Sequence, residues 1–376
     1  MKKLLAILLV LGLCLAMFGC GKTEEAAPAA ADAAAQPAGD LEPGVNGEVV
    51  ISHWGGSTAE AYRECYFNDF ERETGIKVVE VIATNNMSKL EAMVETGTVD
   101  VDIMQGSGLE LNHFETLYNK TGVKYIADLD FSYFDQADLD GLTTDYDNAV
   151  GAFAYASVLA YNTDVFPEDH HPESWADFWD VEEFPGMRTM VSGASGDYPP
   201  LEYALLADGV AVEDLYPVDV DRAFAKLNEI KPNMLKWWMS GAEAPQMLID
   251  GEVVMAEAFS GRIATIASEG APVAYVYNGG GMVFDLFFCP EGSPNYENAM
   301  KLLSYMVQPE RQAKFAEMSN YAPDNQLAYE YLDPEFAATL VTNPENVKKC
   351  FMVDNAYWAE NMYAVQDRWL AWESEG

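Results

Sequence analysis

Positively charged residues are scarce in this sequence of 376 residues, which has 21 lysines and arginines against 61 aspartates and glutamates. The formal net charge is −40. Because contacts to nucleic-acid phosphates need lysine and arginine, this composition argues against a nucleic-acid partner. An acidic surface can concentrate cationic solutes, but it also favours solubility, so net charge alone does not identify a ligand.

Cysteine and histidine are scarce as well, with five and four residues. Cys14 and Cys20 lie in the N-terminal segment, which leaves Cys65, Cys289 and Cys350 for the rest of the chain. Three thiols cannot all pair with one another, and their spacing matches no zinc or CxxC pattern. We expect core or free thiols with at most one disulfide.

Enzyme signatures are missing too. The sequence contains no HExxH, GxSxG or P-loop motif. The stretch "EDHHPE", Glu168–Glu173, offers imidazoles and carboxylates to a metal, but adjacent residues rarely face one site. No nucleophile–base pair can be named. We therefore expect a protein that binds and releases, without a chemical step and without a cofactor.

The N-terminus carries an apolar run, Leu4–Phe18, of about 15 residues. A bilayer-spanning helix needs roughly 20 residues, so the run is short for that role. Two lysines precede it and small residues follow, which indicates a signal peptide over residues 1–19. The ending Met17-Phe18-Gly19-Cys20 resembles a bacterial lipobox, which implies a lipid on Cys20; an ordinary signal peptide with a free secreted protein is the alternative.

Residues 20–46 are rich in alanine, proline and acidic side chains and contain little that can form a core. We interpret them as a disordered tether, because Pro28 and Pro37 interrupt any helix through the alanine run. The folded domain is predicted to start near Gly47.

From residue 47 onward the periodicity of apolar residues alternates between strand and helix. Strands are predicted where short apolar runs end at glycines, and helices where apolar residues recur at helical spacing. The first segments of this kind are 48–54, 58–74, 76–82, 88–96 and 101–105. This alternation is typical of an α/β fold with a mainly parallel sheet.

One later strand contains an unusual residue. The run "GGGMVFDLFFCP", Gly279–Pro290, predicts a buried strand with a single carboxylate, Asp285. An ionised carboxylate is costly in such surroundings unless something compensates it. Asp285 is therefore a candidate ligand-binding residue, although an Asp that caps a turn or pairs with an arginine is the structural alternative.

The order of segments resembles the periplasmic-type solute-binding proteins of ABC transporters, and within them the spermidine/putrescine-binding subfamily. The resemblance covers most of the chain from about residue 47, and no single block carries it. The matching segments are 70–78, 101–108, 158–186, 248–262 and 299–317.

This resemblance implies a two-lobed type II fold in which each lobe is a mixed, mainly parallel sheet flanked by helices. Crossover strands form the hinge, and the ligand lies in the cleft between the lobes. Lobe 1 is predicted to comprise residues 47–150 and about 283–322, and lobe 2 about 151–282 and 323–376. The implied protein is a monomer at the cell surface or in the periplasm, held to the membrane by its lipid alone, with permease and ATPase on separate chains.

The same resemblance implies which side chains meet the ligand. Asp285 is expected to bind an ammonium, Trp54 and Phe259 to stack on the solute, and Ser107 and Tyr155 to contribute weaker contacts. The expected ligand is a small organic cation such as putrescine or spermidine.

Two further residues widen the choice of ligand. Glu257 shares a strand face with Phe259 and is expected to be a second carboxylate, or else to pair with Arg262. Arg262 itself could hold a carboxylate. Polyamine binders carry an aromatic residue where this chain has Val283, and acidic and tyrosine side chains where it has Gly56 and Ser57.

Alternatives to a cationic ligand therefore stay open. The same fold could bind an amino-acid-like or carboxylate solute through Arg262, or ferric iron through clustered tyrosines, although the chain has no Tyr-Tyr pair. Delivery to a sensor rather than a permease is a further alternative. "WWMSG", Trp237–Gly241, is interpreted as helix packing rather than as part of the site.

Overall fold

The structure is a computed structural model that describes residues 41–82 and 86–375. The predicted signal peptide, the lipidation site at Cys20 and most of the predicted tether lie outside the described residues. Within the described ranges, no helix is both long and apolar enough to cross a bilayer.

The described residues form a mixed sheet of ten strands. The strands are β1 (Glu48–His53), β2 (Lys77–Ile82), β3 (Ile103–Ser107), β4 (Ala149–Asn162), β5 (Arg188–Val191), β6 (Met234–Trp238), β7 (Met255–Phe259), β8 (Val273–Phe288), β9 (Ala322–Pro323) and β10 (Phe351–Met352). Their order is β2-β1-β3-β8-β4-β7-β5-β6, with β10 on β8 and β9 on β4.

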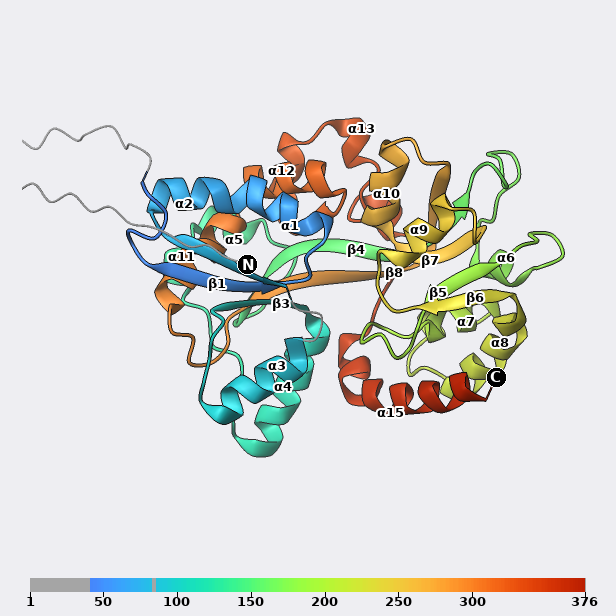
Figure 1. Ribbon diagram of the computed structural model, residues 1–376, viewed down its shortest axis with the longest axis horizontal. Helices are drawn as coiled ribbons and strands as arrows, with labels where there is room; N and C mark the ends of the chain where they lie inside the picture. The colour runs from blue at the N-terminus through green and yellow to red at the C-terminus, as the bar shows by residue number, and fades with distance from the viewer. Residues whose placement is uncertain (1–40, 83–85, 376) are drawn as a thin grey trace, which may run out of the picture. The chain divides into compact units, whose positions relative to one another are not determined.

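The two long central strands, β4 and β8, connect the two parts of this sheet (Figure 1). They pair with each other in antiparallel fashion along most of their length. β3 pairs with the end of β8, and β7 pairs with the end of β4. The parallel strands β1, β2 and β3 thus lie on one side of the central pair, and β5, β6 and β7 on the other.

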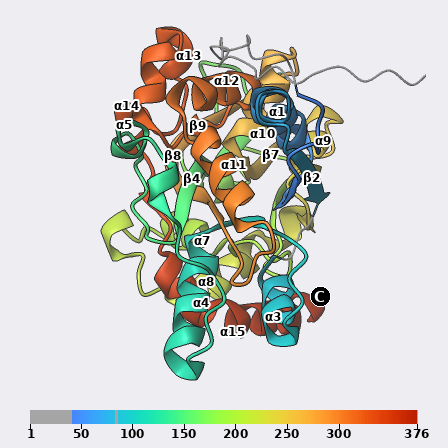
Figure 2. The same cartoon turned by 90° about the vertical axis from the view of Figure 1, so that its left-hand side faces the viewer.

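Helices cover both faces of the sheet. They are α1 (Ser57–Tyr62), α2 (Asn68–Thr74), α3 (Asn86–Thr96), α4 (Gly108–Thr121), α5 (Gln136–Asp140), α6 (Trp175–Trp179), α7 (Leu201–Ala207), α8 (Val220–Ile230), α9 (Glu243–Ile249), α10 (Ser260–Ser268), α11 (Tyr296–Met306), α12 (Pro309–Ser319), α13 (Pro334–Ala337), α14 (Pro344–Val347) and α15 (Asn355–Ser374). Figure 2 shows α1 and α12 on one side of the strands and α3 and α4 on the other.

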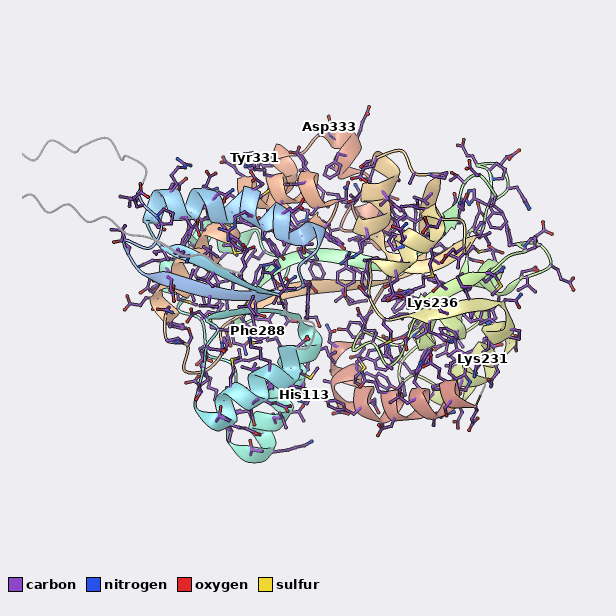
Figure 3. The ribbon with its side chains drawn as sticks, viewed as in Figure 1. His113, Lys231, Lys236, Phe288, Tyr331 and Asp333 are labelled. Atoms are coloured by element: carbon purple, nitrogen blue, oxygen red, sulfur yellow. The ribbon has the colours of Figure 1, made fainter. Side chains whose placement is uncertain are left out.

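Alternation along β8 explains how one strand serves two cores. Phe287 packs into the core beneath α1, α2, α11 and α12, whereas Leu286 and Phe288 pack into the core beneath α3 and α4. Figure 3 shows Phe288 on the α3 and α4 side of the sheet. Successive side chains of a strand point to opposite faces, so Asp285 lies on the same face as Phe287. That face leads to the site described below.

The beginning of the described chain is held by hydrogen bonds. Leu41 N donates to Arg72 O at 2.9 Å, and Gly44 N and Asn46 N donate to Gly75 O at 3.0 and 2.9 Å. Gly75 ends α2 in the left-handed conformation, with φ of 68°. Hydrogen bonds to the folded domain are therefore present at Leu41, six residues before the domain start predicted near Gly47.

Several predicted element boundaries shift in the structure. α3 begins at Asn86, so Ser88 lies inside the helix and does not cap it. Trp237 belongs to strand β6, not to the predicted helix. The Asp285 strand begins at Val273, and Gly279, with φ of 73°, lies in its middle. Cys65, Cys289 and Cys350 are free thiols.

Candidate functional site

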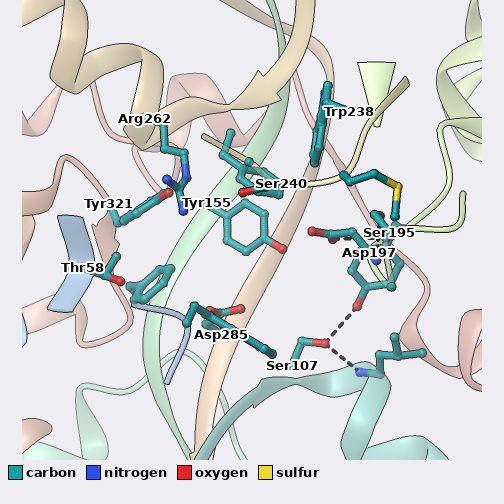
Figure 4. A pocket seen from close by; sticks show the side chains of 18 of the residues that line it. Thr58, Ser107, Tyr155, Ser195, Asp197, Trp238, Ser240, Arg262, Asp285 and Tyr321 are labelled. Carbon is teal, nitrogen blue, oxygen red and sulfur yellow. Dashed lines mark hydrogen bonds between the residues drawn. The ribbon is translucent and has the colours of Figure 1, made fainter. Parts of the chain in front are cut away.

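The carboxyl ends of strands from both parts of the sheet surround one cavity of about 220 Å³ (Figure 4). Ligands of open α/β sheets bind at such ends, where the loops leave space. The lining residues are Trp54, Thr58, Ser107, Leu109, Glu110, Phe153, Tyr155, Ser195, Gly196, Asp197, Tyr198, Trp238, Met239, Ser240, Gly241, Phe259, Arg262, Asp285 and Tyr321. Six of the seven ligand-binding residues predicted from the sequence are in this set.

Asp285 lies on the floor of the cavity and is 4% exposed. Its Oδ2 accepts hydrogen bonds from Trp54 Nε1 at 2.8 Å and Gln105 Nε2 at 2.7 Å. Burial raises the pKa of Asp285 to about 8, and these two donors oppose that rise while the nearby carboxyls of Glu110 and Asp197 add to it. The cost of burying this carboxylate is therefore only partly compensated by the protein itself.

Trp54 reaches Asp285 because the chain turns sharply after β1. Gly55 and Gly56 have φ of 73° and 66°, a region that favours glycine. A Cβ on Gly55 would come within 2.8 Å of the Ile82 side chain, so both sterics and dihedral angle keep the turn tight. The indole is thereby held at the cavity with its N–H on the carboxyl group.

Ser107 lines the cavity, but its hydroxyl is already engaged by the protein. It caps α4 by accepting from Leu109 N at 3.1 Å, and it donates to Glu110 Oε2 at 2.9 Å. A third contact, of 3.0 Å, joins it to the hydroxyl of Tyr198. Because Tyr198 donates its own proton to Asn355 Oδ1, the single proton of the Ser107 hydroxyl is shared between Glu110 Oε2 and Tyr198 Oη. The order Ser107-x-x-Glu110 is a capping-box signature that the sequence already contains.

Aromatic rings form the wall opposite Asp285. The ring of Phe259 packs edge-on against Tyr155, with centroids 5.2 Å apart, and against Trp238 at 5.5 Å. Phe259 ends β7 and Trp238 ends β6, whereas Tyr155 comes from the central strand β4. The wall is therefore assembled from three strands.

Glu257 does not line this cavity, although it shares a face with Phe259 as predicted. It is 1% exposed, and its Oε2 accepts from Val191 N at 2.8 Å. It borders a second, water-sized cavity of about 10 Å³ behind Tyr155 and Phe259. Burial raises its pKa to about 8. Among the described residues no ion pair joins Glu257 to Arg262, so the predicted alternative is not present, and a ligand role for Glu257 stays a prediction.

Arg262, in the first turn of α10, points into the cavity beside Tyr321 (Figure 4). Its Nε is buried and has no hydrogen-bond partner in the part of the chain described here. A glycine makes room for the guanidinium: a Cβ on Gly241 would lie 3.2 Å from Nε, closer than ordinary van der Waals contact. Tyr321 is a side-chain hydrogen-bond partner of Arg262. Within the described residues no carboxylate forms an ion pair with the guanidinium, so this cation can take an external anion.

Acidic groups that sequence reasoning left out of the site also line the cavity. Asp197, in the loop after β5, has a pKa raised to about 6, mainly by burial, with Glu110 adding to the rise and Arg262 opposing it. Burial also raises the pKa of Glu110. In Figure 4, Asp197 and Arg262 lie on opposite sides of Tyr155. The lining thus has one guanidinium and three carboxyl groups.

The "WWMSG" segment divides between core and site. Trp237 packs against Trp369, with ring centroids 5.0 Å apart, whereas Trp238, Met239, Ser240 and Gly241 line the cavity. Reading the pair as a strand would have placed the two indoles on opposite faces. The interpretation of the whole segment as helix packing was therefore wrong for Trp238–Gly241.

The two histidines of "EDHHPE" face different partners. His170 stacks on Phe184, with centroids 5.3 Å apart, and His171 stacks on Tyr161 at 5.0 Å. Across residues 41–82 and 86–375, no group of three His, Cys, Asp or Glu side chains is arranged to hold a metal ion.

Comparison with known proteins identifies the class. The profile of the bacterial extracellular solute-binding proteins matches residues 66–351, and the chain belongs to this family. It is a solute-binding component of an ABC transporter and not an enzyme, as the sequence predicted, and its structural relatives are two-lobed periplasmic binding proteins.

Individual relatives differ in the ligand that they are named for. The gamma-aminobutyric acid-binding protein of Pseudomonas aeruginosa is 35% identical over 331 residues, which cover 86% of this chain and 90% of the relative. The solved structure of the Atu4243 GABA receptor is 32% identical, with a TM-score of 0.76 and coverage of 87% of this chain and 97% of that one. Spermidine/putrescine-binding protein 1 of Haemophilus influenzae is 25% identical over 307 residues, which cover 78% of this chain and 80% of the relative.

These relatives do not confirm the expectation of a polyamine ligand. The chain shares more sequence with proteins named for an amino acid than with those named for spermidine and putrescine. The alternative of an amino-acid-like solute is favoured over the cationic ligand that the sequence analysis put first.

Proposed function

We propose that the protein captures a small amino-acid-like zwitterion and delivers it to the permease of an ABC transporter. The observation that carries this proposal is the guanidinium of Arg262, whose buried Nε has no hydrogen-bond partner among the described residues, in a cavity that also contains Asp285 and Asp197. A zwitterion supplies an anion for the arginine and a cation for the carboxyl groups.

The charges of the lining separate the candidate ligands. An arginine binds a carboxylate through paired N–H donors, and a carboxylate binds an ammonium through charge-assisted hydrogen bonds. A polyamine carries only positive charges, so one end of it would face Arg262 without a compensating anion. An ω-amino acid such as GABA, whose charges sit at the two ends of a short chain, meets both groups.

The size and the apolar wall of the cavity agree with such a ligand. The volume of about 220 Å³ lies below the roughly 300–1,000 Å³ of sites for drug-sized molecules. The rings of Trp54, Tyr155 and Phe259 offer an apolar surface to the methylene groups between the charged ends.

A thermal-shift and calorimetry panel tests the proposal. The purified protein is titrated with GABA, α-amino acids, putrescine, spermidine, small carboxylates and ferric iron. A ligand at about 100 times its Kd stabilises the native state by roughly 2.7 kcal/mol, a readily visible shift. The proposal requires that amino acids raise the melting temperature. It also requires that putrescine and spermidine, which carry amines but no carboxylate, leave the melting temperature unchanged. A shift with spermidine or ferric iron only would contradict it.

Variants assign the charged groups. Arg262→Gln should abolish amino-acid binding and should not weaken any residual binding of putrescine, because only the carboxylate partner is lost. Asp285→Asn should weaken amino-acid binding and leave small carboxylates unaffected. Arg222→Gln is the matched control, since Arg222 is exposed on α8, where it pairs with Asp208. If Arg222→Gln and Arg262→Gln lose the same amount of affinity for amino acids, Arg262 does not bind the ligand.

Lipid anchoring through Cys20 is a separate proposal that rests on the lipobox-like sequence. We propose that the mature protein begins at Cys20 and is held at the membrane surface by its acyl chains. Cys20→Ser should release the protein from the membrane fraction into the soluble secreted fraction. Retention of the Cys20→Ser protein in the membrane fraction would contradict lipid anchoring.

A further inference from the structure

The hydroxyl of Tyr198 connects two segments that belong to different predicted lobes. On one side lies Ser107 Oγ, the cap of α4 in lobe 1, at 3.0 Å. On the other side Tyr198 Oη donates to Asn355 Oδ1, in the first turn of α15 in lobe 2, at 2.5 Å. The hydroxyl that faces the cavity edge is thus committed to protein partners and not left for a solute.

The ring and backbone of Tyr198 are anchored in lobe 2. The ring packs edge-on against Trp358 of α15, with centroids 6.3 Å apart. Its backbone N–H donates to Asp197 Oδ1 at 3.1 Å, beside the acidic part of the cavity. Opening of the two lobes would therefore break the Ser107 contact while the other contacts of Tyr198 stay intact.

The same two helices touch at further points. A Cβ on Gly108 would come within 2.4 Å of the Asn355 side chain, so the start of α15 lies directly against the start of α4. Further along, the ring of Tyr363 on α15 packs edge-on against His113 on α4, with centroids 5.9 Å apart. The contact between α4 and α15 is thus an extended interface beside the cavity.

We propose that Tyr198 is the latch of this interface: its hydroxyl holds α4 against α15 and so determines how long a bound solute stays enclosed. The latch is a positioning device, since it acts on closure and not on the solute. The proposal rests on the solute-binding role alone and does not depend on which solute binds.

Tyr198→Phe tests the latch because it removes one oxygen and keeps the ring against Trp358. Stopped-flow tryptophan fluorescence with GABA as the probe measures association and dissociation separately. We expect dissociation to become roughly tenfold faster, the effect of losing about one hydrogen bond, with association within twofold of the parent protein. Tyr296→Phe is the matched control, since it removes a hydroxyl that donates to Asp128 O at 2.7 Å away from the cavity.

Gly108→Ala provides a second variant that leaves the Tyr198 hydroxyl in place. The new methyl group should push α15 from α4 and so speed dissociation in the same direction. Unchanged dissociation in Tyr198→Phe, or a loss of binding that tracks a fall in melting temperature, would overturn the latch.

Hydrogen exchange of the ligand-free protein separates this test from the identity of the solute. If GABA does not bind, the hydrogen-exchange rates alone test whether Tyr198 acts as the latch. Tyr198→Phe should speed exchange in the first turns of α4 and α15 and leave α8 unchanged. Exchange at parental rates in both first turns would overturn the latch, whatever the solute proves to be.

Discussion

Trp54 Nε1 donates a hydrogen bond of 2.8 Å to Oδ2 of Asp285, a residue 231 positions away in the sequence. Gln105 Nε2 donates to the same oxygen at 2.7 Å. Both donors hydrogen-bond to the same oxygen, and Asp285 lines the cavity. The protein thus orients this carboxyl group without supplying a counter-charge, and we expect a ligand ammonium to provide it.

Trp54→Phe should weaken the binding of amino acids by about tenfold to a hundredfold. A smaller aromatic ring replaces the indole, and the carboxyl group loses a donor whose hydrogen bond is worth about 1.5–3 kcal/mol when the acceptor is charged. Calorimetry with GABA measures the effect. Trp179→Phe is a suitable control, because its N–H donates to Lys226 O, away from the cavity. Parental affinity in Trp54→Phe would show that the hydrogen bond does not prepare the site.

Affinity for an amino acid should rise with pH and level off near pH 8. Burial raises the pKa of Asp285 to about 8, so below that pH the carboxyl group binds a proton that must leave before it can pair with an ammonium. Isothermal titrations from pH 6 to 8.5 follow this change. Asp285→Asn should flatten the curve between the pKa values of the two groups, about 6 and about 8, and Asp197, with a pKa of about 6, should account for what remains at lower pH. If affinity rises as steeply with pH in Asp285→Asn as in the parent protein, the proton that is released on binding belongs to another group.

Glu257→Gln should stabilise the protein at alkaline pH and change little at pH 4. The folded protein holds a proton on Glu257 up to a pKa of about 8, whereas the unfolded chain loses it near 4.5. Between these values the unfolding free energy falls with rising pH by roughly 1.4 kcal/mol per unit from this group. Glutamine keeps an acceptor for Val191 N and removes the charge. Melting temperatures at pH 4 and 8.5, with Glu229→Gln as an exposed control, check this, and equal shifts at both pH values would refute it.

Gly241→Ala should narrow the cavity and lower affinity at least about tenfold. The added Cβ would lie 2.5 Å from the Phe259 ring and 3.2 Å from Arg262 Nε, so both side chains must move. Overpacking of this kind costs about 1–3 kcal/mol. Ser240→Ala, a neighbouring change that removes atoms, is the control. If Gly241→Ala binds as well as Ser240→Ala, Phe259 and Arg262 do not form the binding surface.

Local patterns predicted a large part of this protein. The alternating strands and helices, the buried strand around Asp285 and the placement of Glu257 and Phe259 on one face follow from backbone periodicity, which short stretches of sequence determine. The resemblance to solute-binding proteins placed Trp54, Tyr155 and Arg262 at the cavity. Ser107 was placed there too, but its capping box, also readable locally, engages its hydroxyl.

Tertiary structure alone decided the rest. Asp197, Trp238 and Tyr321 come from a loop, a strand end and the second position after α12, and no local pattern relates them. Glu257 shows most clearly what local patterns do not predict. Strand alternation predicted which face of the sheet Glu257 lies on, but the packing of Tyr155 and Phe259 places it at the second cavity and not at the main one. A strand's period is fixed by bonds between neighbours, whereas the depth and charge of a cavity depend on contacts between segments far apart in the chain.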